Sequence, residues 1–176
     1  PDGNDSQHGV SGTEGNGMKH IISALVENEP GVLARIVGLI SGRGYNIDSL
    51  SVAPTQDSTT SRLTMVVPGD DRVIEQVTKQ LNKLIDVIKV QDLTSESYLE
   101  RELALVKVQT TSRSRSAVVE LAALFHAEVL HVQQKSLVLQ MVGTVERIEE
   151  FVELLRPHGI QDISRSGVIA VAKSES

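Results

Sequence analysis

The apolar residues of this chain follow the same pattern twice, and this repeat limits the possible folds more than any other feature. Residues 20–27 form an apolar run rich in β-formers, and residues 31–44 carry apolar residues at helical spacing. Two strand-like segments, a second helix and a last strand complete the first copy, and residues 102–172 repeat this order. The sequence therefore predicts an α+β protein with two ferredoxin-like βαββαβ domains, each a four-stranded antiparallel sheet with both helices on one face.

Changes in composition divide the chain into four segments. Residues 1–17 are rich in Gly, Asp, Asn and Ser and hold a single aliphatic residue, so we expect a flexible tail. Met18 is the expected natural start, with the tail before it an addition from recombinant expression. The first domain should span residues 18–93 and the second residues 100–173, joined by a polar linker at 94–99 where the apolar periodicity lapses.

Composition disfavours several classes of function. The net charge is −6 and aromatic residues make up 2% of the chain, whereas a nucleic-acid surface needs a basic face and stacking side chains. No apolar run is long enough to cross a membrane. The chain has no cysteine, which fits a reducing compartment and removes thiolate nucleophiles and cysteine zinc sites. We therefore expect a cytoplasmic protein with aliphatic cores that binds neither nucleic acid nor membrane.

No pattern of reactive residues indicates a catalytic site. The five histidines lack metal-ligand spacing, and the chain contains no G-x-S-x-G elbow and no G-K-[S/T] phosphate loop. The segment Thr111–Val118 ("TSRSRSAV") resembles a basic phosphate-binding loop at a helix start, although serine caps are commonplace at such positions. We expect this chain to be no enzyme, with no catalytic residues, no metal site and no cofactor of its own.

Two turns offer the groups that a free amino acid needs: "ENEPG" (Glu27–Gly31) and "RGYNI" (Arg43–Ile47). A helix start supplies N–H donors and partial positive charge to a carboxylate, and Gly31 permits a ligand to approach the backbone closely. Asn28 and Asn46 can each offer an amide oxygen to an ammonium group. Asparagine also shapes turns without any ligand, so these residues alone leave both interpretations open.

Three segments resemble a known family. Residues 27–55 ("ENEPGVLARIVGLISGRGYNIDSLSVAPT"), 61–67 ("SRLTMVV") and 101–108 ("RELALVKV") look like the regulatory small subunit of acetolactate synthase, also called acetohydroxyacid synthase. The similarity covers essentially all of the chain from Met18 onward. "PGVLAR" is typical of ACT domains, which sense amino acids, whereas "RGYNI-(D/E)-SL" is more specific. The resemblance implies an N-terminal ACT domain and a C-terminal ferredoxin-like domain.

The resemblance also implies a function and a ligand. The family's small subunit binds a separate thiamine-diphosphate-dependent catalytic (large) subunit, activates it, and makes it sensitive to feedback inhibition by valine in branched-chain amino-acid biosynthesis. Thiamine diphosphate, magnesium and FAD are accordingly expected in the catalytic partner. Ligands of such ACT proteins lie between two chains, which implies a homodimer through the ACT domains. The valine-binding residues implied for this chain are Asn28, Gly31, Val32 and Leu33 of one copy, with Asn46 and Ile47 of the second copy closing the site.

A stand-alone ACT-type amino-acid sensor that regulates another protein is the alternative interpretation. The acidic charge disfavours direct contact with DNA but leaves other protein targets open. A small ferredoxin-like enzyme such as an acylphosphatase would need an arginine-bearing phosphate loop after its first strand, and "ENEPG" contains no arginine. The second repeat has no N-x-x-P-G turn, so we expect only the first domain to form an amino-acid site.

Overall fold

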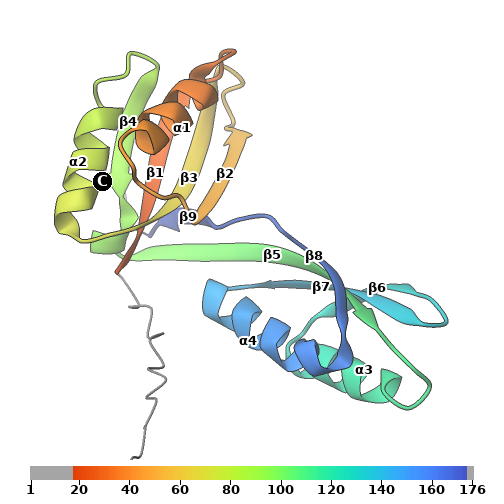
Figure 1. The fold of residues 1–176 in the computed structure, drawn as a ribbon. Helices are drawn as coiled ribbons and strands as arrows, with labels where there is room; N and C mark the ends of the chain where they lie inside the picture. Colours follow the sequence, from red (N-terminus) through yellow and green to blue (C-terminus); the bar gives the residue numbers. More distant parts are fainter. Residues whose placement is uncertain (1–17, 174–176) are drawn as a thin grey trace, which may run out of the picture.

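The computed structural model of this chain describes residues 18–173. They form two sheets, and each sheet carries two helices on one of its faces (Figure 1). This arrangement confirms the predicted α+β class with two ferredoxin-like domains. The tail expected at residues 1–17 lies outside the described residues. Within residues 18–173, no helix combines the length and the apolar character needed to span a bilayer.

The first domain contains four strands and two helices in the predicted order. They are β1 (Lys19–Glu27), α1 (Val32–Gly42), β2 (Ser49–Pro54), β3 (Thr60–Pro68), α2 (Asp71–Leu81) and β4 (Val87–Asp92). All pairings are antiparallel and the strand order is β2-β3-β1-β4. The strands β1 and β3 are therefore central, while β2 and β4 form the edges of this sheet.

Alternation along the strands sends every second side chain of the first sheet toward its helices. In β1 these residues begin at Ile22, and in β3 they include Leu63, both fully buried. The helix α1 contributes Ile36 and Ile40, whose spacing of four places them on one face. Burying one such side chain contributes roughly 1.5–3 kcal/mol. The core of the first domain consists of Ile22, Ala24, Val26, Val32, Ile36, Ile40, Leu63, Met65, Val67, Ile74, Val77 and Leu81.

The second domain repeats this plan after a short 3-10 helix. Its elements are η1 (Leu93–Ser95), β5 (Tyr98–Gln109), α3 (Arg115–Leu124), β6 (Glu128–Val132), β7 (Ser136–Gly143), α4 (Val145–Leu155), η2 (Arg156–His158), β8 (Ile160–Arg165) and β9 (Ile169–Ala172). The antiparallel order β6-β7-β5-β8 matches that of the first sheet. A second core of twelve buried residues lies between this sheet and the helices α3 and α4.

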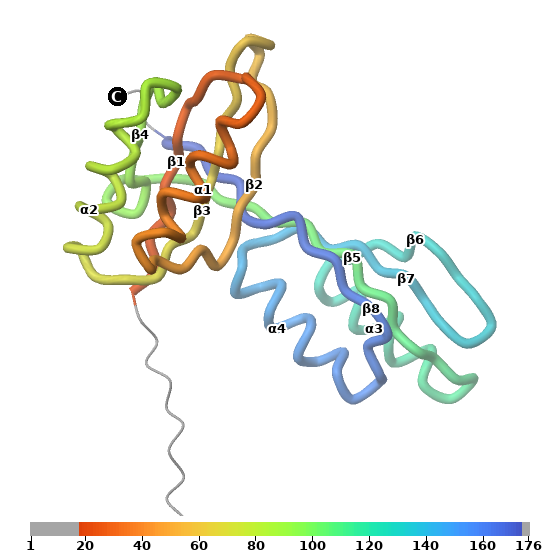
Figure 2. Tube along the Cα trace, turned by 45° about the horizontal axis from the view of Figure 1, so that its top comes forward, coloured from red at the N-terminus to blue at the C-terminus, as the bar shows by residue number. Residues whose placement is uncertain are grey.

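The structure adds one strand to the four predicted for the second domain. Residues 159–172 divide into β8 and β9 because the chain turns at Gly167, where φ is +77°. The strand β9 pairs with the first residues of β5, with Tyr98 opposite Ala172. The segment 94–99, predicted as a linker, contains the end of η1 and the start of β5. Figures 1 and 2 both show β5 as one long strand that runs from the first domain into the second.

The ribbon of β5 and β9 covers the face of the first sheet that its helices leave open. Val168 and Ala170 are buried there against Ile21 of β1 and Val66 of β3. Leu93 from η1 completes this third cluster of buried residues. Because its members come from both domains, the two domains share a small hydrophobic core and are not joined by the chain alone.

Candidate functional site

The helix α1 begins at a glycine and has no side-chain cap among residues 18–173. Its N-cap residue is Gly31, with φ +86° and ψ −10°, and its first turn contains no acidic residue. The helix α2 differs, because Asp70 caps it and accepts a hydrogen bond from the N–H of Val73 at 3.0 Å. Uncapped N–H groups and the helix dipole together favour an anion such as a carboxylate. The start of α1 is therefore suited to bind one.

Arg35 adds positive charge beside this helix start. Its Nη2 and Nε atoms lie 2.7 and 2.9 Å from Oδ2 of Asp86, which holds the guanidinium in place. A Cβ atom added to Gly31 would lie 3.2 Å from Nη1 of Arg35. Arg35 was not among the predicted residues. Its spacing of four residues from Gly31 places it on the same helix face, but the contact with Asp86 that holds it there joins residues 51 positions apart.

Asn28 lies next to this helix start, where two hydrogen bonds fix it to the β2–β3 turn. Its backbone N–H donates to the carbonyl of Thr59 at 2.8 Å, and its Nδ2 donates to the carbonyl of Ser58 at 2.9 Å. Within the described part of the chain, its Oδ1 accepts no hydrogen bond. The side chain thus keeps an exposed acceptor, the group that an ammonium requires.

Asn46 is held in a similar way at the other end of α1. Its Nδ2 donates to Oδ1 of Asp48 at 2.8 Å, and Oδ2 of the same carboxylate lies 3.3 Å from Nζ of Lys19. Among residues 18–173 its Oδ1 also accepts no hydrogen bond. Ile47 packs against the first core, which anchors the turn. Asp48 was not among the predicted residues, and its role in orienting Asn46 is seen only in the folded chain.

The six predicted residues fall into two groups. Asn28, Gly31 and Leu33 lie together and exposed at the start of α1, where Val32 can offer only its backbone because its side chain is 2% exposed. Asn46 and Ile47 follow the end of this helix, whose eleven residues span about 16 Å. One small amino acid cannot contact both ends. A complete site of these six residues therefore needs a second copy of the chain, in keeping with the homodimer that the resemblance implies.

A separate cavity of about 490 Å³ lies between the two domains, near the start of β2. Four of its lining residues are acidic groups of the second domain: Glu100, Glu102, Glu146 and Glu149. Arg165 binds Glu102, which is almost fully buried, through two hydrogen bonds of 2.9 and 2.7 Å. Burial, and next the nearby carboxylate of Glu146, raise the pKa of the Glu100 side chain above its ordinary value of 4.5.

Replacing Glu100 with glutamine is expected to stabilise the protein near neutral pH. The folded state holds a proton on Glu100 more readily than the unfolded state does. The contribution of this proton to the free energy of unfolding is therefore fully present below pH 4.5 and is lost as the pH rises through the raised pKa. The uncharged variant avoids this loss. The denaturant midpoint of Glu100→Gln should therefore exceed that of the parent near neutral pH, and the two midpoints should converge below pH 4.5. The control Glu120→Gln, at an exposed position of α3, should have the midpoint of the parent at both pH values. A less stable Glu100→Gln protein at neutral pH would contradict this prediction.

The segment that resembles a phosphate-binding loop serves a structural purpose. Nη2 of Arg115 donates to the carbonyls of Gln133 and Gln134 at 2.6 Å each, which ties the start of α3 to the β6–β7 turn. Thr111 and Ser114 hydrogen-bond one another across the turn. Among residues 18–173, no three His, Cys, Asp or Glu side chains form a group that could hold a metal ion.

Two ferredoxin-like domains, the first with an uncapped and glycine-led helix start, define a tandem ACT-type protein. Comparison with known families agrees with this class. Residues 22–89 match the AHAS small subunit-like ACT domain, and residues 101–174 match the small subunit of acetolactate synthase. The chain belongs to the acetolactate synthase small-subunit family.

Individual relatives and a solved structure support the same assignment. The chain is 46% identical to the probable acetolactate synthase small subunit of Archaeoglobus fulgidus over 89% of its own length and 98% of the relative's. It is also 46% identical to the acetolactate synthase small subunit of Aquifex aeolicus, over 93% and 85% of the two lengths. The crystal structure of the Thermotoga maritima small subunit matches with a TM-score of 0.82 at 33% identity, covering 90% of this chain and 99% of that one. These matches confirm the resemblance found in the sequence.

Proposed function

We propose that this chain is the regulatory subunit of an acetolactate synthase, which activates a thiamine-diphosphate-dependent catalytic subunit and makes it sensitive to valine. The observation that carries the ligand assignment is the uncapped start of α1, where Gly31 opens the backbone beside the amide oxygen of Asn28, which accepts no hydrogen bond from residues 18–173. A carboxylate on the helix start and an ammonium between amide oxygens satisfy both charges of an amino acid. The apolar side chain of valine would contact Leu33, which is 39% exposed.

A homodimer through the first domains supplies the second half of this site. The strand β2 has a neighbouring strand on one side only within the described residues, and Val52, on its helix-facing side, is 42% exposed. An edge strand with uncovered apolar surface favours a symmetric contact with a second copy. We therefore expect a dimer in sedimentation experiments at micromolar concentration with valine present. A monomer under these conditions would contradict the two-chain site.

Reconstitution with a catalytic subunit tests the proposal as a whole. We expect the catalytic chain to co-purify with this one, and its acetolactate formation from pyruvate to rise on addition of this chain and to fall when valine is added. This chain alone should produce no acetolactate with thiamine diphosphate, magnesium and FAD supplied, since these cofactors are proposed to reside in the partner. Turnover by the isolated chain would refute the regulatory assignment. A valine-binding dimer that neither binds nor activates a catalytic chain would instead indicate a stand-alone sensor.

A further inference from the structure

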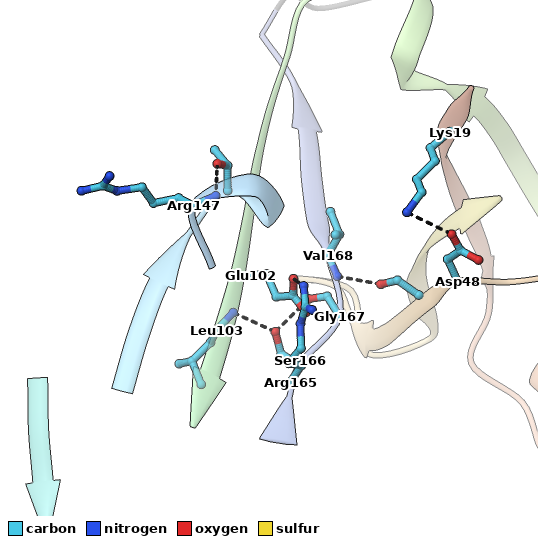
Figure 3. A network of polar contacts seen from close by, with 11 residues as sticks. Lys19, Asp48, Glu102, Leu103, Arg147, Arg165, Ser166, Gly167 and Val168 are labelled. Carbon is cyan, nitrogen blue, oxygen red and sulfur yellow. Dashed lines mark hydrogen bonds and ion pairs between the residues drawn. The ribbon is translucent and has the colours of Figure 1, made fainter. Parts of the chain in front are cut away.

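The turn that carries Asn46 leads directly into a contact with the second domain. The strand β2 starts at Ser49, three residues after Asn46, and the Oγ of Ser49 accepts a hydrogen bond from the N–H of Val168 at 2.9 Å. The two residues are 119 positions apart in the chain. Figure 3 shows this bond between the two domains, with the Lys19–Asp48 ion pair beside it.

Gly167 brings the two backbones together at this contact. It has φ +77°, and a Cβ atom there would lie 3.0 Å from Oγ of Ser49 and 3.1 Å from the carbonyl oxygen of Leu50. Both distances are shorter than ordinary van der Waals contacts, so a side chain here would require its neighbours to shift, and the backbone conformation also favours glycine. Any shift of the start of β2 must therefore move this glycine or break the contact. We refer to Ser49, Leu50, Gly167 and Val168 as the inter-domain joint.

The two residues before Gly167 are in turn bound to the strand β5 of the second domain. The N–H of Ser166 donates to the carbonyl of Leu103 at 2.9 Å, and its Oγ accepts from the N–H of Leu103 at 3.0 Å. The preceding residue, Arg165, holds Glu102 through two hydrogen bonds (Figure 3). Contacts on both sides thus link the start of β2 to the strand β5, which runs through the second sheet.

We propose that the inter-domain joint couples occupancy of the amino-acid site to the position of the second domain. This inference rests on the proposed function. A ligand that engages Oδ1 of Asn46 restrains the turn that Asp48 and Lys19 hold, and β2 begins one residue after Asp48. The shared core beneath the joint has only five buried residues, so its packing resists a shift less than the core of either domain does. Valine then acts by favouring one arrangement of the domains over another.

Two variants test this inference in the reconstituted holoenzyme. Ser49→Ala removes the acceptor of the Val168 N–H. Gly167→Ala introduces backbone strain and a close contact of the new Cβ with Ser49 and Leu50. We expect valine to bind each isolated variant dimer within about twofold of the parent affinity. Inhibition at saturating valine should weaken, with the coupling between valine and the holoenzyme reduced at least about fivefold. A purely structural role would not separate binding from inhibition in this way, and retained valine binding shows that each first domain is folded.

Matched controls come from the same chain. Ser51→Ala removes a hydroxyl from the same face of β2 and leaves the Ser49–Val168 hydrogen bond and the glycine at 167 in place. Gly159→Ala has similar backbone strain, at φ +90°, and its Cβ would meet only Gln109 at ordinary distances. Both controls should be inhibited like the parent. If the parent holoenzyme is inhibited and both joint variants are inhibited equally well, the joint does not couple the domains. If the parent itself neither binds valine nor responds to it, the proposed function falls and this inference with it.

Discussion

Replacing Gly31 with valine is expected to raise the valine concentration needed for half-inhibition of the reconstituted holoenzyme by more than about tenfold. The φ of +86° disfavours any β-branched residue, and the new Cβ would lie 3.2 Å from Nη1 of Arg35. The side chain would also cover the backbone N–H groups that are proposed to receive the ligand's carboxylate. A valine titration of the holoenzyme measures this shift, while activation in the absence of valine should persist.

The control for this prediction lies in the same helix. Apart from its chain neighbours and the adjacent backbone of α1, no described atom lies within 4 Å of a Cβ added at Gly38, so Gly38→Val introduces the same side chain without crowding the helix start. Gly31→Ala separates the effect of backbone strain from that of steric bulk, because alanine introduces the same strain with a smaller side chain. Full valine sensitivity of a folded Gly31→Val protein would show that the start of α1 is only a turn.

Replacing Asn46 with alanine is expected to weaken valine binding by roughly one to two orders of magnitude. A hydrogen bond from an ammonium to its Oδ1 would contribute about 1.5–3 kcal/mol, and each 1.4 kcal/mol or so changes affinity tenfold. Activation should largely persist, because the substitution removes a ligand contact and leaves the rest of the surface unchanged. Calorimetry on the dimer and inhibition of the holoenzyme should report the same shift.

Asn82→Ala provides the matched control for Asn46→Ala. Asn82 ends α2 as Asn46 follows the end of α1, and it is exposed on the same domain. Its loss should leave valine binding unchanged. If Asn46→Ala binds valine as tightly as the parent, the bond from Asn46 to Asp48 merely shapes the turn, which is the interpretation that the sequence alone left open.

Local patterns in the sequence were sufficient to predict the fold. Period-two alternation marked the strands, apolar residues at helical spacing marked the helices, and Gly31 marked the start of α1. The first part of β5 was missed because the segment 94–99 is polar and is followed by three charged residues, Glu100 to Glu102. This stretch is a strand because β9 pairs with it, and Glu102 is tolerated inside because Arg165 binds it. Both partners lie more than sixty residues away, beyond the reach of a local pattern.

For the candidate site too, local patterns in the sequence predict the turns, but not the long-range contacts that support them. The turns around Asn28 and Asn46 could be found from the sequence because asparagine, proline and glycine mark turns directly. The supporting roles of Arg35 and Asp48 depend on contacts with Asp86 and Lys19, which only the folded chain brings near. The two asparagines of one chain cannot contact the same ligand, because the length of α1 separates them.

The continuity of β5 determines how this chain can be divided. Its first four residues and β9 cover Ile21 and Val66 of the first sheet, although both belong to the part of the chain that follows the first domain. A fragment ending at residue 93 would therefore expose an apolar patch and be prone to self-association. A chimera that carries this ACT domain into another protein would need to include the β5–β9 ribbon as well.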